Sequence, residues 1–180
     1  MKSTLVNMTA VLFGITLVAS AGVGAVNMIT AEPIAQAEQA AKVEALKVVL
    51  PPFDQTVPEA LTIDDMPITV YTATKGGQVA GYAVESMTKN GFGGAIDMMV
   101  GVDVSGAVTG VAIVSQSETA SLGANCTRED FRAQFTGKTG TLSVSKDGGE
   151  IEALTGATVT SRAVTEGVNT ALEFVQEVLK

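Results

Sequence analysis

The stretch that most limits the fold of this chain is apolar and lies near its N-terminus. No charged residue occurs from Ser3 to Ala31, and the segment Leu5 to Ile29 consists mostly of apolar and small residues. A helix needs about 20 such residues to cross the ~30 Å hydrocarbon layer of a membrane. We therefore expect a single transmembrane anchor over residues 1–30, with the rest of the chain outside the lipid.

A cleaved signal peptide is the alternative for this stretch, because small residues between Ala19 and Ala25 could form a cleavage site. The apolar core of a signal peptide usually has only about 7–15 residues, which favours the uncleaved anchor. Lys2 precedes the span, whereas Glu32 follows it and the next basic residue is Lys42. The positive-inside tendency then predicts a cytoplasmic N-terminus and an extracytoplasmic (periplasmic) C-terminal domain at the inner or plasma membrane.

Charge and composition exclude several classes of protein. The chain has 180 residues with 11 basic and 19 acidic side chains, a net charge of −8, which argues against a nucleic-acid partner. It contains no His and a single cysteine, Cys126. Zinc sites, Ser-His catalysis and cysteine-ligated iron–sulfur clusters are therefore excluded, and we expect no metal site and no catalytic residues of its own.

The segment after the apolar stretch has the composition of a spacer helix. Residues 31–52 are rich in Ala, Glu, Gln and Lys, with Pro33 near the start and Pro51 and Pro52 at the end. We expect a solvated helix that leads away from the membrane surface. A loop over Phe53 to Pro67 should then introduce a folded domain that comprises residues 53–180.

Strand patterns dominate the first half of that domain. Alternating, β-prone runs separated by glycine-containing turns predict two hairpins, which pair residues 68–73 with 79–84 and residues 95–102 with 108–114. The connection between the hairpins, Asn90 to Gly94, holds three glycines around Phe92. Such a segment can let the backbone approach a flat ligand, or it can be no more than a flexible connection.

The second half of the domain reads as helices with one more strand. Thr127 to Phe135 resembles a short helix capped by Thr127, and a strand is expected at Thr141 to Val144, before a turn at 146–149. Ser161 to Lys180 is amphipathic. Its apolar positions at helical spacing are Val164, Val168, Ala171, Leu172, Val175, Val178 and Leu179. The predicted fold class is α+β, an antiparallel sheet packed by helices.

Four hydroxyl residues lie within the seven positions Thr155 to Ser161, around a Gly-Ala pair and just before the last predicted helix. One interpretation is N-capping, in which Thr158, Thr160 or Ser161 bonds free amides of the first turn, worth about 1 kcal/mol. The other is an anion site at the helix N-terminus, with one hydroxyl close enough to carry a phosphate. Spacing alone favours the cap.

The order of residues in this stretch favours the second interpretation, an anion site that carries a phosphate. Glu152-Ala153-Leu154-Thr155-Gly156-Ala157-Thr158 resembles the acceptor motif of FMN-binding domains, although the family usually has Asp where this chain has Glu152. The resemblance implies that a separate flavin transferase links FMN through a phosphoester to Thr158. Thr155, Gly156 and Ala157 would then belong to the cofactor site.

A second segment carries the same resemblance. Glu118 to Gly123 is similar to the Glu-Thr-Pro-Gly-Leu-Gly loop of that family, with Ala120 and Ser121 in place of Pro and Gly. We expect this turn to be held less rigidly and to be remodelled, because Ser121 cannot cheaply adopt a positive φ. The resemblance implies that the flavin ring is bordered by Glu118, Thr119, Leu122, Gly123, Gly93 and Gly94.

The order of these parts resembles the G subunits of Rnf ion-translocating electron-transport complexes over nearly the whole chain. This implies an electron-transfer subunit of a ferredoxin:NAD oxidoreductase, with other membrane and iron–sulfur subunits as partners. The related C subunits of sodium-translocating NADH:quinone reductases share the motifs but are usually longer between anchor and acceptor. A membrane-anchored scaffold without cofactor and a cleaved, secreted flavoprotein remain as alternatives.

Attachment of the flavin is expected to require another enzyme. A threonine hydroxyl is a poor nucleophile at its ordinary pKa, and the sequence places no His or Lys next to the acceptor motif to activate it.

Overall fold

The computed structural model describes residues 5–63 and 66–178 of the chain. Lys2 and Leu179, which entered the predictions above, lie outside the described residues. The chain divides after Ala40 into two compact units, an N-terminal helical unit and a larger C-terminal unit.

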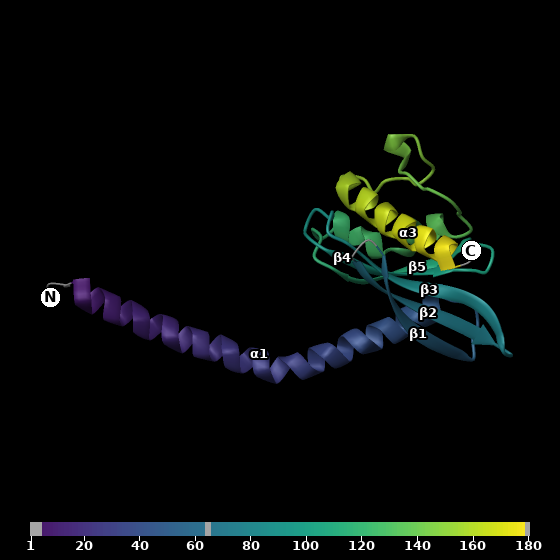
Figure 1. Cartoon of the computed structure of the whole chain (residues 1–180). Helices are drawn as coiled ribbons and strands as arrows, with labels where there is room; N and C mark the ends of the chain where they lie inside the picture. Colours follow the sequence, from purple (N-terminus) through teal and green to yellow (C-terminus); the bar gives the residue numbers. More distant parts are fainter. Residues whose placement is uncertain (1–4, 64–65, 179–180) are drawn as a thin grey trace. The chain divides into compact units, whose positions relative to one another are not determined.

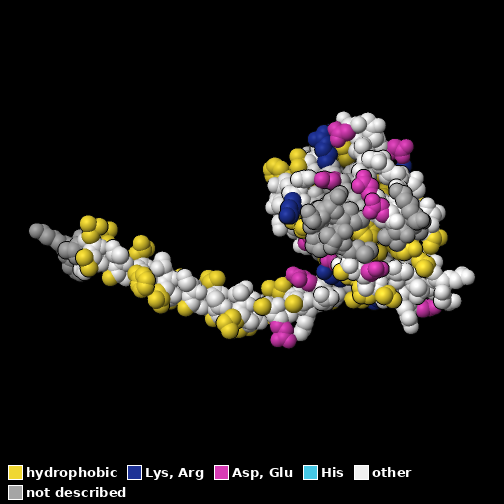
Figure 2. Space-filling view, viewed as in Figure 1, with side chains coloured by type: hydrophobic (Ala, Val, Ile, Leu, Met, Phe, Trp, Pro, Cys, Tyr) yellow, Lys and Arg dark blue, Asp and Glu magenta, His cyan; other side chains and the backbone are white. Residues whose placement is uncertain are grey.

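The first unit consists of the N-terminal part of helix α1 (Leu5–Val49), whose apolar side chains are exposed, as Figure 2 shows. Within the described residues it is the one helix long and apolar enough to cross a membrane. Where a spacer helix was expected over 31–52, α1 simply continues, with Pro33 inside it. It ends at Val49, before the two prolines that were expected to stop it.

The second unit is built on a five-stranded antiparallel sheet. The strands follow one another in space in the order of the sequence, so every connection joins neighbours. Both predicted hairpins are confirmed, as β2–β3 and β4–β5. The strands are β1 (Gln55–Ile63), β2 (Met66–Lys75), β3 (Gln78–Thr88), β4 (Ile96–Val102) and β5 (Val108–Gln116).

Strand β1 corrects one prediction, because a loop was expected over Phe53 to Pro67. β1 lies at the edge of the sheet and pairs only with β2, with Pro58 opposite Tyr71. Proline cannot donate to a ladder and is tolerated at an edge, where one side of the strand needs no partner. Pro58 is therefore the reason why the sequence did not predict strand β1.

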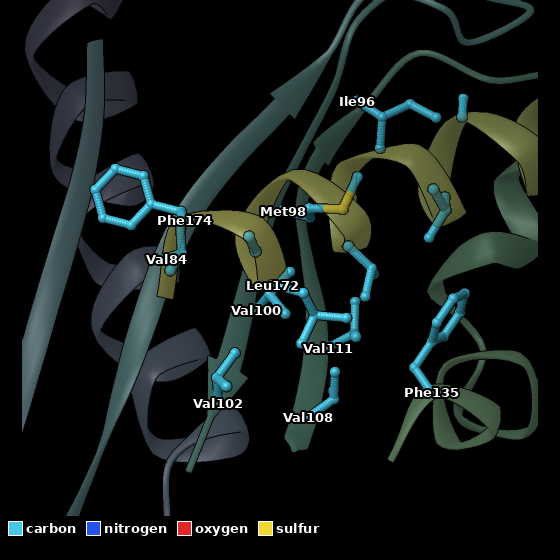
Figure 3. Packing of buried hydrophobic residues seen from close by; sticks show 14 of the residues in the cluster. Val84, Ile96, Met98, Val100, Val102, Val108, Val111, Phe135, Leu172 and Phe174 are labelled. Carbon is cyan, nitrogen blue, oxygen red and sulfur yellow. The ribbon is translucent and has the colours of Figure 1, made fainter. Parts of the chain in front are cut away.

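Helix α3 (Thr158–Val178) covers one face of the sheet, and Figure 1 shows it lying across the strands. The apolar positions predicted for its buried face include Val164, Val168 and Leu172, and all three are buried. Figure 3 shows the layer that this face forms with side chains from β3, β4 and β5. The labelled strand residues of this layer are Val84, Ile96, Met98, Val100, Val102, Val108 and Val111.

The opposite face of the sheet is covered by the end of α1. Leu46 and Val49 pack with Met99 of β4, so β4 is buried on both faces, and its residues from Met98 to Val102 form an apolar run. Thr109 Oγ1 donates a hydrogen bond of 2.5 Å to the Val49 carbonyl. A Cβ on Gly101 would stand 2.1 Å from the same carbonyl oxygen, so only glycine admits the helix there. The expected solvated spacer is thus a packed element at its C-terminal end.

The segment between β5 and α3 differs most from prediction. In place of one helix over 127–135 there are η1 (Gly123–Thr127), α2 (Glu129–Arg132) and η2 (Ala133–Phe135). Thr127 does not cap α2, because Thr127 Oγ1 donates to the Ala124 carbonyl at 2.9 Å and Arg128 holds the cap position. The predicted strand at 141–144 is wrong too. Val144 forms a single parallel bridge with Ile151, around the turn η3 (Ser145–Asp147).

Candidate functional site

Helix α3 begins at Thr158, so three of the four clustered hydroxyls, those of Thr158, Thr160 and Ser161, lie in its first turn. The whole cluster was expected to precede the helix, but only Thr155 does. The Ser161 hydroxyl accepts a hydrogen bond from the Leu154 amide at 2.9 Å and donates to the Ala157 carbonyl at 2.9 Å. The Thr160 hydroxyl donates to Glu118 Oε2 at 2.5 Å. These two hydroxyls therefore tie the helix start to other segments, and the capping interpretation does not describe them.

Thr158 is half-buried and forms part of the wall of a cavity of about 320 Å³. The cavity joins the start of α3 to the loop that follows β5. Seven of the sequence-predicted site residues line it, namely Glu118, Thr119, Leu122, Gly123, Gly156, Ala157 and Thr158. Three further residues complete its lining, namely Phe92, Val159 and Thr160.

Three predicted site residues do not line this cavity. Thr155 instead lines a neighbouring hollow of about 320 Å³, which it shares with Glu152. Gly93 and Gly94 are also absent from the cavity lining. A Cβ on Gly93 would stand 2.1 Å from the Ser117 carbonyl oxygen, so this glycine permits contact between two protein segments.

Glu118 connects the three segments around the cavity. Glu118 is 8% exposed, and its carboxylate accepts hydrogen bonds from the Thr160 hydroxyl and, at 2.8 Å, from the Gly93 amide. A buried carboxylate costs free energy unless hydrogen bonds satisfy it, and these bonds come from the β3–β4 connection and from α3. Glu118 therefore fixes the position of its own loop against both.

The Glu118 to Gly123 loop keeps a glycine-like backbone without the glycine. Ser121 has φ 63°, the one positive φ among the described non-glycine residues. The left-handed region costs an ordinary residue about 1–2 kcal/mol. Asn125 Nδ2 donates to the Ser121 carbonyl at 3.0 Å and helps to hold the conformation. Ser121 thus adopts the positive φ that was expected to be costly for it, and the turn carries strain.

Lys146 corrects another expectation, namely that no lysine lies beside the acceptor hydroxyl. Lys146 Nζ donates a hydrogen bond of 2.9 Å to Thr158 Oγ1. The neighbouring Asp147 accepts two hydrogen bonds of 2.7 Å from Arg162 of α3. These bonds hold the pKa of the Asp147 carboxyl below its usual range. The turn η3 is thus clamped to α3 and places an ammonium at the helix start.

Cys126 lies in the core near Glu118 and has no reactive character. Burial, together with the smaller effect of the negative charge on Glu118, raises the pKa of its thiol to about 11. In the described part of the chain no group of three or more Asp, Glu, Cys or His side chains could hold a metal ion. The chemistry of the site therefore rests on the hydroxyl, the lysine and the cavity.

The cavity walls suit a flat apolar group that carries a phosphate. Phe92, Leu122 and Val159 are all exposed to the extent of 42–73% and offer apolar contact area. Thr158 and Lys146 supply a hydroxyl and a positive charge at the start of a long helix, whose free amides and dipole favour an anion.

Four contributors to this site were not among the predicted site residues: Phe92, Lys146, Val159 and Thr160. Val159 and Thr160 follow the motif directly and could have been included as its neighbours. Lys146 had no local signal, because its contact depends on the Val144–Ile151 bridge and on the Asp147–Arg162 ion pair.

Comparison with known families and proteins agrees with this geometry. Residues 91–173, which include the cavity lining, match the FMN-binding domain family. The chain is 34% identical over 169 residues to the G subunit of the ion-translocating oxidoreductase complex of Vibrio cholerae, a match that covers 83% of this chain and 79% of that one. It is 30% identical to the equivalent protein of Shewanella baltica, covering 97% and 91%.

A higher identity occurs over a shorter stretch. The G subunit of the proton-translocating ferredoxin:NAD(+) oxidoreductase complex of Clostridium ljungdahlii is 46% identical over 109 residues, so the match spans little more than half, 58%, of each chain. Among solved structures, the C subunit of the Na(+)-translocating NADH-quinone reductase of Parabacteroides distasonis has a TM-score of 0.54 at 24% identity, covering 63% of each chain. That likeness concerns the fold alone.

Proposed function

Because this chain belongs to the family of G subunits of ion-translocating oxidoreductase complexes, we propose that it is an FMN-carrying electron-transfer subunit of such a complex, of the Rnf type that couples ferredoxin and NAD. The cofactor supplies the redox chemistry when bound, and the protein supplies position and environment. The observation that carries the proposal is the cavity with Thr158 in its wall.

The residues of the site fit FMN. A cavity of about 320 Å³ is at the lower end of the range for small-molecule sites, about 300–1,000 Å³, and suits a ring system more than a whole nucleotide. Phe92, Leu122 and Val159 offer apolar contacts to a ring. The phosphate belongs at the hydroxyl end, beside Thr158 and Lys146.

The link to FMN is a phosphoester at Thr158. Of the two motif threonines, Thr158 lines the cavity and contacts Lys146, whereas Thr155 lines the neighbouring hollow. Lys146 donates to the hydroxyl and so is no base for it, and the sequence contains no His. The base must come from a flavin transferase that modifies this chain.

The family and helix α1 place the chain at a membrane. Within that location, residues 1–30 are the membrane span, residues 31–52 lead away from it and residues 53–180 carry the flavin. The charge asymmetry around the span supports a cytoplasmic N-terminus and an extracytoplasmic flavin domain. The partners are the other membrane and iron–sulfur subunits of the complex.

The mass of the intact chain tests the attachment. We expect the chain produced with a flavin transferase to gain the mass of one FMN phosphoester and to keep flavin fluorescence after denaturation. Thr158→Ala should abolish both signals because the acceptor oxygen is gone, whereas the matched variant Thr155→Ala should keep them. Covalent flavin on Thr158→Ala would place the acceptor elsewhere, and an unmodified wild-type chain would contradict the covalent link.

A further inference from the structure

We infer that Lys146 holds the acceptor oxygen of Thr158 during flavin attachment and then binds the phosphate joined to that oxygen. The inference rests on the proposed attachment of FMN at Thr158. It adds to the site a residue from outside both sequence motifs, twelve positions before the acceptor.

The position of Lys146 is built into the fold. The Val144–Ile151 bridge closes the loop that contains the lysine, and the Ser145 amide donates to the Ile151 carbonyl at 2.8 Å. The next residue, Asp147, is bound by both arms of the Arg162 guanidinium, one turn along the helix from Thr158. These two contacts fix the backbone around the exposed Lys146, whose ammonium reaches Thr158 Oγ1.

The charge of Lys146 is placed differently from that of nearby basic side chains. Lys138 pairs with Glu150, and Arg162 pairs with Asp147. Among the described residues, the hydrogen-bond partner of Lys146 is a neutral hydroxyl. A phosphodiester formed at that hydroxyl carries one negative charge, which the ammonium would meet directly.

The transfer of FMN to Thr158 is favoured by a positive charge such as that of Lys146. FMN alone has no good leaving group, so the donor must be a flavin dinucleotide bound by the transferase. The Thr158 Oγ–P bond forms and the P–O bond of the phosphoanhydride breaks. The nucleoside monophosphate leaves with the electron pair, and the Oγ proton passes to a base of the transferase. Negative charge grows on the oxygens around phosphorus, where a nearby cation lowers the barrier.

Kinetics of flavin incorporation test the inference on the full-length chain. With a flavin transferase and flavin adenine dinucleotide, mass spectrometry of the intact chain gives the rate of modification. We expect Lys146→Met to lower the kcat of the transferase for this substrate by about tenfold, with little change in KM, because the lysine acts on the reacting oxygen. Lys146→Arg, which keeps the charge, should restore most of the rate.

Lys138→Met is the matched control, since it removes the same charge from the same part of the chain and breaks a surface ion pair. It should be modified at the wild-type rate. Lys146→Met with the wild-type kcat would overturn the inference, and so would Lys146→Arg as slow as Lys146→Met when both unfold at the wild-type temperature. A wild-type chain that gains no flavin would instead contradict the proposed function.

Discussion

At the scale of single residues, the site combines a buried carboxylate whose hydrogen bonds are made with a backbone position that is strained. Glu118 is buried, yet its carboxylate accepts two hydrogen bonds from two other segments. Ser121 holds a backbone conformation that favours glycine, on the loop that Glu118 secures. Strain of this kind persists only where the surroundings fix the conformation, and here they include the Asn125 amide.

Replacing Ser121 with glycine should stabilise the domain. The left-handed conformation costs Ser about 1–2 kcal/mol, and glycine avoids this cost. Glycine also loses more backbone freedom on folding, which offsets about 0.5–1 kcal/mol of the gain. We expect Ser121→Gly to raise the free energy of unfolding in urea by about 0.5–1 kcal/mol. Ser121→Ala keeps the strained φ and should give no gain. A glycine variant no more stable than wild type would show that the strain is relieved elsewhere.

Cys126 should make stability fall at high pH. Its pKa is about 11 in the folded chain, higher than that of an exposed thiol, so between about pH 9 and 11 the unfolded chain has lost the proton that the folded chain keeps. The slope of unfolding free energy with pH is then negative. We expect a loss of about 2 kcal/mol across this window in the wild type beyond that in Cys126→Ala. Parallel curves for the two proteins would contradict the raised pKa.

At the scale of elements, the end of α1 and helix α3 meet the sheet on opposite faces. The last turn of α1 packs on one face, and α3 packs on the other. The helix end can approach because small residues line its path, among them Ala73, Ala83, Gly101 and Ala112. Docking of α1 therefore depends on small residues in strands β2 to β5 as well as on the helix itself.

Gly101→Ala should disturb this docking. The added methyl group would stand 2.1 Å from the Val49 carbonyl oxygen and 2.5 Å from Thr109 Oγ1, so the helix end must shift. We expect a loss of about 1–3 kcal/mol in the free energy of unfolding and faster amide exchange at residues 45–50. Gly110→Ala, whose nearest contact is at 3.2 Å, should cost less. Equal losses in the two variants would argue against a specific clash.

The same elements show what a sequence can reveal. Strands β2 to β5 follow from alternation and glycine turns, because their hydrophobic pattern is local. Strand β1 was missed because Pro58 sits in it, and proline is acceptable there only because β1 is an edge. The end of α1 was expected to be solvated because its partner residues on the sheet, among them Ala73, Ala83 and Met99, are distant in the sequence.

At the scale of the whole molecule, the candidate site unites segments that are distant in sequence. The two motifs, residues 118–123 and 152–158, could be identified from their amino-acid sequences, and both contribute residues to the same cavity. Lys146 could not be found this way, because three-dimensional contacts of Asp147 and Ile151 position it. The resemblance implied that Gly93 borders a ligand, and nothing in the sequence indicated that its missing side chain also permits the contact with Ser117. The residues of the motifs could thus be predicted from the sequence, but the contacts that position them could not.

The placement of Thr158 within the first turn of α3 limits how far an attached group can swing. Helical backbone angles fix the Cα, and a β-branched side chain in a helix has few χ1 rotamers, so the pivot is short and stiff. If the flavin is attached at Thr158, as we propose, this pivot adds little to the movement that the ribityl chain itself allows. An electron donor or acceptor would then have to approach the start of α3.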